Sequence, residues 1–403
     1  MAPFTSTEDR ISQEDQNTNR KIGSPFDVKQ MISDVKYIDW SKIRWSQVVL
    51  YSMLHVLWCI GAYYIITFQW RWQTAIYALF IGCLGALGVT MVNHRMFCHG
   101  AMKAVWPFKP ILLLLATIGG EESIFYFCKK HRSHHKYSDT ERDYTNANRG
   151  FFFAHMGWRF IEHSPLVLEA FDKMDMRDLL ADPFVMFQYK YYYYFHIFFK
   201  LLFPTLIPVY FWNEDPFTSF VICYGFRYLT VLQLTFSLSS VAHYYGDKPF
   251  DASKGAVDNP ICAIYALGEG YHNFHHAFPR DYRTSEMNNW LYNGTTKVID
   301  TLAAMGLIYD LHTTPEDQIR KRVNRTGNEE LFERRKAFNK WAIPEAMCPS
   351  NCGRGYIARE PHSEPLVGGA PFFHMIEELD RLPLECEKTH LRASIAFDVL
   401  LPF

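Results

Sequence analysis

The sequence lacks an excess of charge of either sign. Its 403 residues include 41 Lys and Arg against 42 Asp and Glu, which gives a formal net charge of -1. Such a chain has no long-range attraction for nucleic acid, so we expect no nucleic-acid partner. The sequence also lacks a G-x-G-x-x-G motif after a strand and a C-x-x-C-H haem attachment motif. Any electrons that its chemistry requires must therefore come from another protein.

Signals for secretion and disulfide formation are also missing. The first twenty residues, MAPFTSTEDRISQEDQNTNR, are polar and include acidic residues, whereas a secretory signal has an apolar core and a transit peptide has few acidic residues. Without a secretory signal, the nine cysteines give no disulfide framework. Residues 1–45 are polar and lack apolar periodicity, so we expect a disordered cytosolic arm there.

What the sequence does contain is long uncharged apolar runs. Residues 48–68 and 74–93 are each long enough to cross a hydrocarbon layer of about 30 Å as a helix. A second pair, 195–212 and 216–242, carries one basic residue in each run. Two adjacent uncharged runs of this length make a buried helical pair of a soluble protein a poor alternative. The sequence therefore predicts an all-α integral membrane protein with four transmembrane helices in two hairpins. The second run also carries small residues that let membrane helices approach closely, at Gly82, Gly85 and Gly88.

The topology follows from the even number of spans. Residues 94–194 and 244–403 would lie on one side of the membrane, together with both termini. Basic residues near the span ends assign that side to the cytosol, since positive charge is enriched there: Lys103, Lys109, Lys129, Lys130, Arg132, Lys136 and Lys190. Residues 106–120 are apolar but too short to span, so we expect an interfacial or re-entrant helix. The sequons at Asn293 and Asn324 would then stay unglycosylated.

Histidines gather just outside the predicted spans. Nine of the 17 occur in four places: His94, His99, His131, His134, His135, His243, His272, His275 and His276. In each of the two HxxHH motifs, the first residue shares a helical face with the fourth and the fifth, so two or three imidazoles can bind one metal. A catalytic zinc takes three protein ligands, so nine indicate two metal ions. Imidazole alone does not distinguish iron from zinc, copper or nickel. Residues 94 and 99 lie about 140° apart on an α-helix, so they require a helix end or two different metals.

Five segments carry a family resemblance: HRMFCH, HRSHHKYSDTERD, NANRGFFFAHMGW, GEGYHNFHHAFPRDYRTSE and QIRKRVNRTG. In order and spacing they resemble the membrane acyl-CoA desaturases of the stearoyl-CoA (Δ9) type, especially those of animals. The resemblance extends from about Lys36 to Gly327. It implies four membrane helices under a cytosolic helical cap, with two iron ions (Fe2+) bound by all nine histidines. It implies no catalytic residue beyond these ligands.

The resemblance also implies an activity, a location and partners. The activity would be O2-dependent insertion of a cis double bond near C9 of a saturated fatty acyl-CoA, in the endoplasmic reticulum membrane. Electrons would come from cytochrome b5 and its NADH-dependent reductase. The desaturase domain would occupy residues 46–330, and residues 331–403 would form a tail of unknown role.

Several positions depart from the family pattern where the family binds its substrate. Glu121 replaces a Gln and Phe127 replaces a Trp. Glu162 and His163 align with an Arg-Lys pair that meets the CoA phosphates in the family, and a Glu there repels phosphate. Thr235 matches the family. We predict that these five residues are substrate-binding positions and that CoA is held weakly or the accepted chain is unusual.

A further change lies beside the fourth histidine site. Ser239 stands where the family has an Asn that reaches one iron through a water, and a hydroxyl can still hydrogen-bond a water. Three interpretations remain open: an active desaturase of altered specificity, a related di-iron fatty acyl hydroxylase, and a regulatory or binding paralogue of low activity. The nine retained histidines favour an enzyme.

Overall fold

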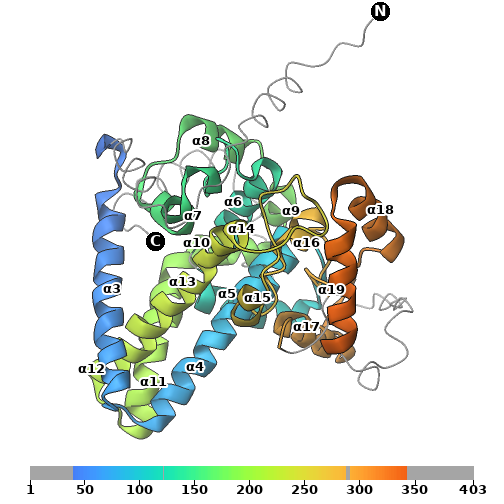
Figure 1. Ribbon diagram of the computed structural model, residues 1–403. Coiled ribbons are helices and arrows are strands. Elements are labelled where there is room, and N and C mark those ends of the chain that lie inside the picture. Colours follow the sequence, from blue (N-terminus) through green and yellow to red (C-terminus); the bar gives the residue numbers. More distant parts are fainter. Residues whose placement is uncertain (1–39, 121, 287–290, 343–403) are drawn as a thin grey trace, which may run out of the picture.

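The computed structural model describes residues 40–120, 122–286 and 291–342 (Figure 1). Helices form nearly all the regular structure in this part of the chain. Its two short strands, β1 (Lys103–Ala104) and β2 (Ile308–Tyr309), pair in antiparallel fashion. The predicted all-α class is confirmed. Of the expected amino-terminal arm, residues 1–39 lie outside the described residues, and Trp40–Lys42 form a short 3-10 helix, η1.

Four helical stretches are long and apolar enough to cross a membrane: Trp45–Ile66, Trp72–Cys98, Pro183–Trp212 and Pro216–Tyr244. The third begins before the expected residue 195, because Pro183 opens it and the Asp182 side chain caps it by accepting from Phe184 N and Val185 N. In order, these stretches consist of α3 (Trp45–Ile66); α4 (Trp72–Leu87) and η2 (Gly88–Cys98); α10 (Pro183–His196), η6 (Ile197–Leu202) and α11 (Phe203–Trp212); and α12 (Pro216–Ser219), η7 (Phe220–Phe226), α13 (Arg227–Ser239) and α14 (Val241–Tyr244).

The two hairpins are joined where their turns meet, at the end of the molecule away from the cap (Figure 1). Glu214, in the second turn, is 6% exposed. Its carboxylate accepts from the backbone N–H of Arg71 at 2.8 Å and from the Thr74 hydroxyl at 2.5 Å. Trp212 donates its indole N–H to the same hydroxyl at 2.8 Å. A buried carboxylate satisfied in this way ties the first hairpin to the second.

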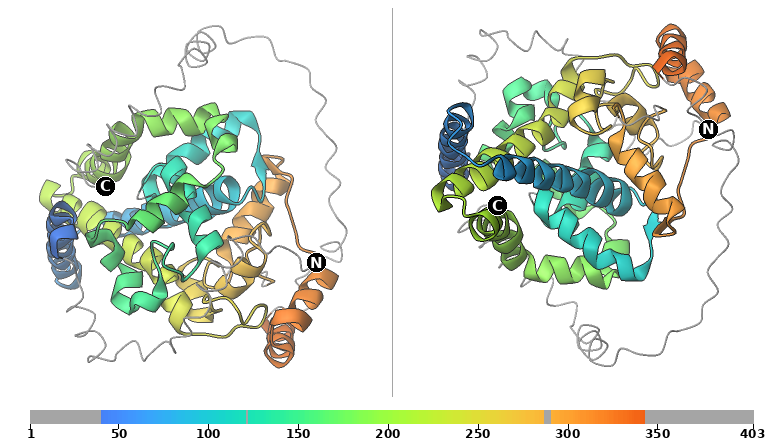
Figure 2. Two further views of the ribbon diagram at one scale, coloured as in Figure 1. Left: turned by 90° about the horizontal axis from the view of Figure 1, so that it is seen from above. Right: turned by 90° about the horizontal axis from the view of Figure 1, so that it is seen from below.

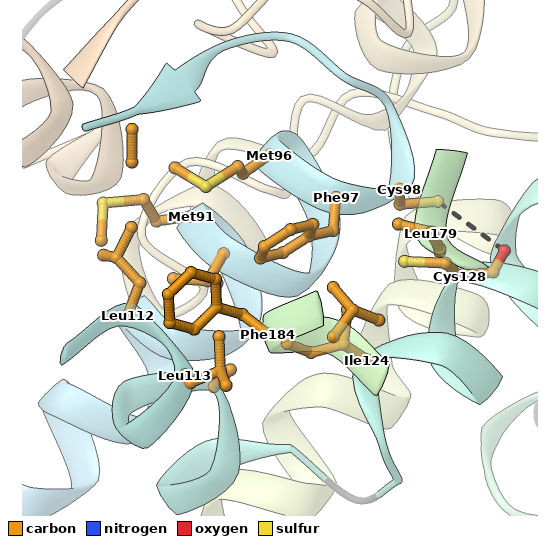
Figure 3. Packing of buried hydrophobic residues seen from close by; sticks show 14 of the residues in the cluster. Met91, Met96, Phe97, Cys98, Leu112, Leu113, Ile124, Cys128, Leu179 and Phe184 are labelled. Atoms are coloured by element: carbon orange, nitrogen blue, oxygen red, sulfur yellow. Dashed lines mark hydrogen bonds between the residues drawn. The ribbon is translucent and has the colours of Figure 1, made fainter. Parts of the chain in front are cut away.

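Glycines let α4 and η2 approach α5 (Lys109–Gly119). A Cβ added at Gly88 would overlap the Leu115 carbonyl, and one added at Gly119 would overlap the Gly85 carbonyl. The predicted close approach is therefore confirmed, with α5 as the partner. Gly82 instead faces Arg227, since a Cβ added at Gly82 would lie 3.6 Å from the Arg227 Cγ. Figure 3 shows the apolar core that these contacts enclose, with Met91 and Phe97 of η2 against Leu112 and Leu113.

The stretch expected to be interfacial or re-entrant ends at a sharp bend. It comprises η3 (Trp106–Phe108) and α5, and α6 (Ile124–Tyr137) follows at an angle of 70°, an arrangement found in broken spans and re-entrant loops. Seen from below, α4 runs from the edge toward the middle of the molecule, beneath the cap (Figure 2, right). The end of η2, in the first hairpin, thus lies where the cap helices meet.

The remaining helices belong to the cap. They are η4 (Ala147–Arg149), α7 (Phe151–His155), η5 (Gly157–Phe160), α8 (Pro165–Asp172), α9 (Arg177–Leu180), α15 (Pro260–Tyr265), α16 (His272–Ala277), α17 (Gly294–Ala304), α18 (Glu316–Thr326) and α19 (Glu329–Ala342). The expected domain boundary at residue 330 falls inside α19. The rest of the expected tail, residues 343–403, lies outside the described residues.

Candidate metal centre

Nine histidines converge in two groups under the cap. The first contains His94, His99, His131, His135 and His275, and the second contains His134, His243, His272 and His276. Within each group, one potential ligand atom per residue lies within 4.8 Å of all the others. Every member of the second group is buried. These are the nine residues that the sequence singled out.

The first pair owes its position to a π-helix. Helix η2 is wound with i→i+5 hydrogen bonds, and the His99 N–H donates to the His94 carbonyl at 3.2 Å. This winding brings residues five apart to the same side, and the two ring centroids are 4.9 Å apart. Both rings belong to one group, and His99 stands at the end of η2. Of the two predicted alternatives, this geometry favours the helix end over two different metals. The angle of about 140° assumed a regular α-helix.

Each HxxHH motif supplies both groups. On α6, His131 and His135 face the first group and His134 faces the second. On an α-helix, a residue four positions on points about 40° away from the direction of the first residue, whereas one three positions on points about 60° away in the opposite sense. The fourth and fifth residues of the motif therefore point to different sides. Helix α16 does the reverse, with His275 in the first group and the other two histidines of its motif in the second. The groups are adjacent, since the rings of His135 and His276 stack with centroids 4.2 Å apart.

The spacing of ring nitrogens fits bound metal. In the first group, Nε2 atoms lie 2.9 Å apart between His94 and His275, 2.9 Å between His275 and His135, and 3.0 Å between His135 and His131. Nitrogens bound to one metal at about 2.0–2.1 Å are separated by about 3 Å. The Nε2 atoms of His99 and His243 are buried and have no hydrogen-bond partner among the described residues. Both groups can therefore hold a cation.

Three carboxylates, of which Glu269 and Asp143 are buried and Asp139 is half-buried, hydrogen-bond the ring nitrogens that point away from the metal sites. Glu269 lies 2.9 Å from His94 Nδ1, Asp143 lies 2.9 Å from His134 Nδ1, and Asp139 lies 3.0 Å from His243 Nδ1. An Nδ1–H that donates to a carboxylate leaves Nε2 as the metal-binding lone pair. The sequence analysis missed these residues. In the sequence they are marked only by position: Asp139 and Asp143 follow the first HxxHH motif, and Glu269 lies three positions before His272.

Burial sets the protonation of the rings. Desolvation, reinforced by neighbouring imidazoles, lowers the pKa well below its ordinary value in six of them: His99, His131, His135, His272, His275 and His276. Burial also opposes the charged form of His134, but Asp143 outweighs it and raises the pKa of that ring. Most of the cluster is thus neutral, the form that binds metal.

With this geometry established, the sequence comparisons identify the family. The sequence profile described as fatty acid desaturase matches residues 70–289, more than half of the chain. The chain belongs to the fatty acid desaturase family. It is similar to the Delta(9)-fatty-acid desaturase fat-7 of Caenorhabditis elegans, with 41% identity over 307 residues, 76% of this chain and 90% of that protein.

Two further desaturases show the range of named activities. The acyl-CoA Delta12-desaturase of Acheta domesticus is 41% identical over 287 residues, 71% of this chain and 80% of its own length. The human stearoyl-CoA desaturase is 36% identical over 310 residues, 75% of this chain and 85% of its own length. The expected membership in an animal acyl-CoA desaturase group is confirmed.

The predicted substrate positions of this desaturase lie in different settings. Phe127 stacks on the metal-site ring of His131, with centroids 5.5 Å apart and planes at 15°. Glu162 is exposed, while the His163 ring lies 6.2 Å from that of Tyr144 and 5.4 Å from that of Phe171. Burial lowers the pKa of His163 well below its ordinary value. Of the aligned pair, only Glu162 is therefore fully open to solvent. The fifth position, Glu121, lies outside the described residues.

The hydroxyls of Thr235 and Ser239 are engaged with the backbone. Thr235 donates to the Val231 carbonyl at 3.0 Å, and Ser239 lies 2.7 Å from the Ala154 carbonyl. The Ser239 proton is thus used by a carbonyl, which leaves only oxygen lone pairs for a water.

The basic side chains of Lys130 and Arg159 are paired with a carboxylate. Lys130 lies 2.5 Å and Arg159 3.2 Å from the Glu122 carboxylate, so a residue next to Glu121 neutralises two bases near the metal centre.

Proposed function

We propose that this chain is an O2-dependent fatty acyl-CoA desaturase in which the nine histidines hold two iron ions. The observation that carries the proposal is the sorting of nine mostly buried imidazoles into two adjacent groups with ligand-like nitrogen spacing. The names of the relatives supply the substrate class, and those named Delta(9) favour a cis double bond near C9. Per turnover, a saturated acyl chain, O2, two electrons and two protons give one double bond and two waters.

In this reaction the residues of the chain have two roles, which are to bind the metal ions and to exclude water. The nine histidines would hold two irons, which together with O2 would supply the oxidising power that an unactivated methylene pair requires, a chemistry that no side chain provides. The described residues hold the cations, and Asp139, Asp143 and Glu269 fix the tautomers of three ligands. The buried setting keeps water away from the reacting carbon atoms.

The proposal includes an electron donor and a location. Electrons would come from cytochrome b5 and its NADH-dependent reductase, and the protein would reside in the endoplasmic reticulum with both termini in the cytosol. The four membrane helices and the basic residues at their ends support this topology. A glycosylation assay should monitor Asn324, which is exposed, because Asn293 is fully buried and closed to modification in the folded protein. Glycosylation of Asn324 in intact cells would contradict the topology.

Expression in yeast that lacks its own Δ9 desaturase tests the activity. We expect growth without added unsaturated fatty acid and new monoenes whose double-bond position is read by mass spectrometry. A double bond at C12 would retain the reaction class and correct the position. New hydroxy fatty acids would favour the hydroxylase, and a metal-loaded protein without product would favour the regulatory paralogue. In parallel, metal analysis of purified protein should find two irons per chain, and zinc alone would refute the iron assignment.

A further inference from the structure

Helix α19, the last helix among the described residues, shares an apolar cluster with the helix that carries the third histidine motif. It lies beyond residues 70–289, the part matched by the family profile. Phe332 of α19 is 2% exposed and belongs to an apolar cluster with Phe250 and Phe274. The Phe250 and Phe274 rings meet at 5.0 Å, and those of Phe250 and Phe332 at 5.8 Å. Phe274 lies within α16, between His272 and His275, so α19 is joined to the motif through an apolar cluster in which Phe250 touches both Phe332 and Phe274. Figure 1 shows where α16 and α19 lie in the cap.

Arg335, one turn further along α19, makes the polar contact. Its guanidinium lies 2.9 Å from the Asp258 carboxylate and 2.6 Å from that of Glu286. Its side chain is 11% exposed, and that of Asp258 is 1% exposed. The guanidinium also lies over the Tyr271 ring, 4.0 Å from its centroid. A planar fork that pairs with two carboxylates and stacks on an aromatic face uses properties specific to arginine.

Two of the three groups that Arg335 contacts, Asp258 and Tyr271, lie at the first turn of α16. The Asp258 Oδ1 accepts from the backbone N–H of Asn273 at 2.8 Å and of Phe274 at 3.2 Å. The first N–H groups of a helix have no partner within it, and here one carboxylate satisfies two of them. Tyr271 precedes His272 and occupies the N-cap position of the helix, although its side chain makes no capping hydrogen bond. Arg335 thus holds the carboxylate and the N-cap residue that together fix where α16 begins.

The position of the start of α16 determines where the ligands of both histidine groups lie. Helix α16 has six residues, and its three histidines are divided between the two groups. A rotation or shift of α16 would misplace ligands in both groups together. We propose that Arg335 is a positioning residue for the metal centre and acts through Asp258 and Tyr271. Helix α19, which carries Arg335, is then required for tight metal retention. This inference rests on the proposed metal site.

The test measures metal retention by full-length protein in detergent. Wild type, Arg335→Gln, Arg335→Lys and the matched control Arg334→Gln are loaded with ferrous iron, and loss of iron to an excess of chelator is followed over time. Arg334 is exposed and adjacent. Changes to residues that orient metal ligands typically weaken metal binding by about 10–100-fold. We expect release at least tenfold faster from Arg335→Gln, an intermediate rate from Arg335→Lys, and the wild-type rate from Arg334→Gln.

A second readout separates positioning from general stability. Cobalt replaces iron, and its visible absorption bands report ligand geometry; thermal unfolding is measured on the metal-free forms. The proposal requires altered bands and faster release in an Arg335 variant whose metal-free unfolding midpoint matches that of Arg334→Gln. If the Gln variant does not accumulate, the Lys variant is compared. Wild-type release from both Arg335 variants, or a change only in the unfolding midpoint, overturns the inference and leaves the proposed function standing. Wild type that binds no metal overturns both.

Discussion

The Asp139 carboxylate lies 3.0 Å from His243 Nδ1, across a separation of 104 residues in the sequence. Asp139 follows the second histidine motif in the cap, and His243 ends the fourth membrane helix. Burial acts to raise the Asp139 pKa, but His243 outweighs it and holds the pKa below its ordinary value, so the carboxylate stays ionised. This contact ties a membrane helix to the cap at the second histidine group.

Replacement of Asp139 by Asn should weaken metal binding. An amide can donate as well as accept, so it no longer selects the His243 tautomer that directs Nε2 at the metal. We expect about 10–100-fold lower metal affinity, measured by iron titration of the purified variant. Glu141→Gln is the matched control, because Glu141 is exposed nearby. Wild-type affinity in Asp139→Asn would refute the orienting role.

Gly255→Ala should produce the same defect from the other side of the contact. A Cβ at this position would overlap the Asp139 carboxylate and lie 3.4 Å from His243 Nδ1. We expect Asp139 to be displaced and iron content to fall as in Asp139→Asn. Gly294→Ala is the control, because its added Cβ would meet only the Leu267 side chain at 3.6 Å. Equal iron content in the two variants would show that Asp139 can move at no cost.

The metal-free protein should lose stability below neutral pH. Six histidines of the cluster have pKa values lowered in the folded state, so the unfolded chain binds protons first as the pH falls through the ordinary histidine pKa of about 6.5. Stability is therefore full above that pH and decreases below it. The raised pKa of His134 acts in the opposite sense but is one group against six. Thermal unfolding at pH 7.5 and 5.5 should show a lower midpoint at 5.5, and a higher one would contradict this assignment.

The two residues aligned with the CoA-binding pair should respond differently to a return to basic residues. Glu162 is exposed, so Glu162→Arg should lower the KM for acyl-CoA by about tenfold, the value of one charged hydrogen bond. His163 lies against aromatic rings, so His163→Lys places an ammonium group in an apolar setting and should reduce stability. Steady-state kinetics and thermal unfolding of each single variant distinguish the two effects. An unchanged KM in Glu162→Arg would show that the carrier is held elsewhere.

The sequence was sufficient to predict the membrane helices and the nine clustered histidines, because both signals are local. A long run of apolar residues predicts a membrane helix without reference to the rest of the chain, and a repeated HxxHH motif predicts histidines on one face of a helix. For His94 and His99 the sequence left two alternatives, a helix end or two different metals. The regular helical period separates the two residues, and nothing in the sequence indicated the π-helix that brings them together at the end of the span.

Other features depend on residues that are distant in sequence. Pairing of Asp139 with His243 and of Arg335 with Asp258 requires the fold to be assembled. Its place after the second histidine motif marks Asp139 as a candidate, but no local pattern identifies the partner of either residue. Likewise, His163 aligns with a phosphate-binding position, yet its ring packs against Tyr144 and Phe171. Alignment transfers a position, and packing decides whether a side chain reaches solvent.

The carboxylate of Glu214, which joins the two hairpin turns, also sets an order for biosynthesis. Glu214 is synthesised 140 residues after Thr74, the residue that it binds in the first turn. During translation, the first hairpin is therefore made before the acceptor that fixes its turn, and the second histidine motif is also made before that acceptor. The membrane frame closes only when the second hairpin inserts, and the fourth helix, the last to enter, brings His243 to a cap that has already begun to form.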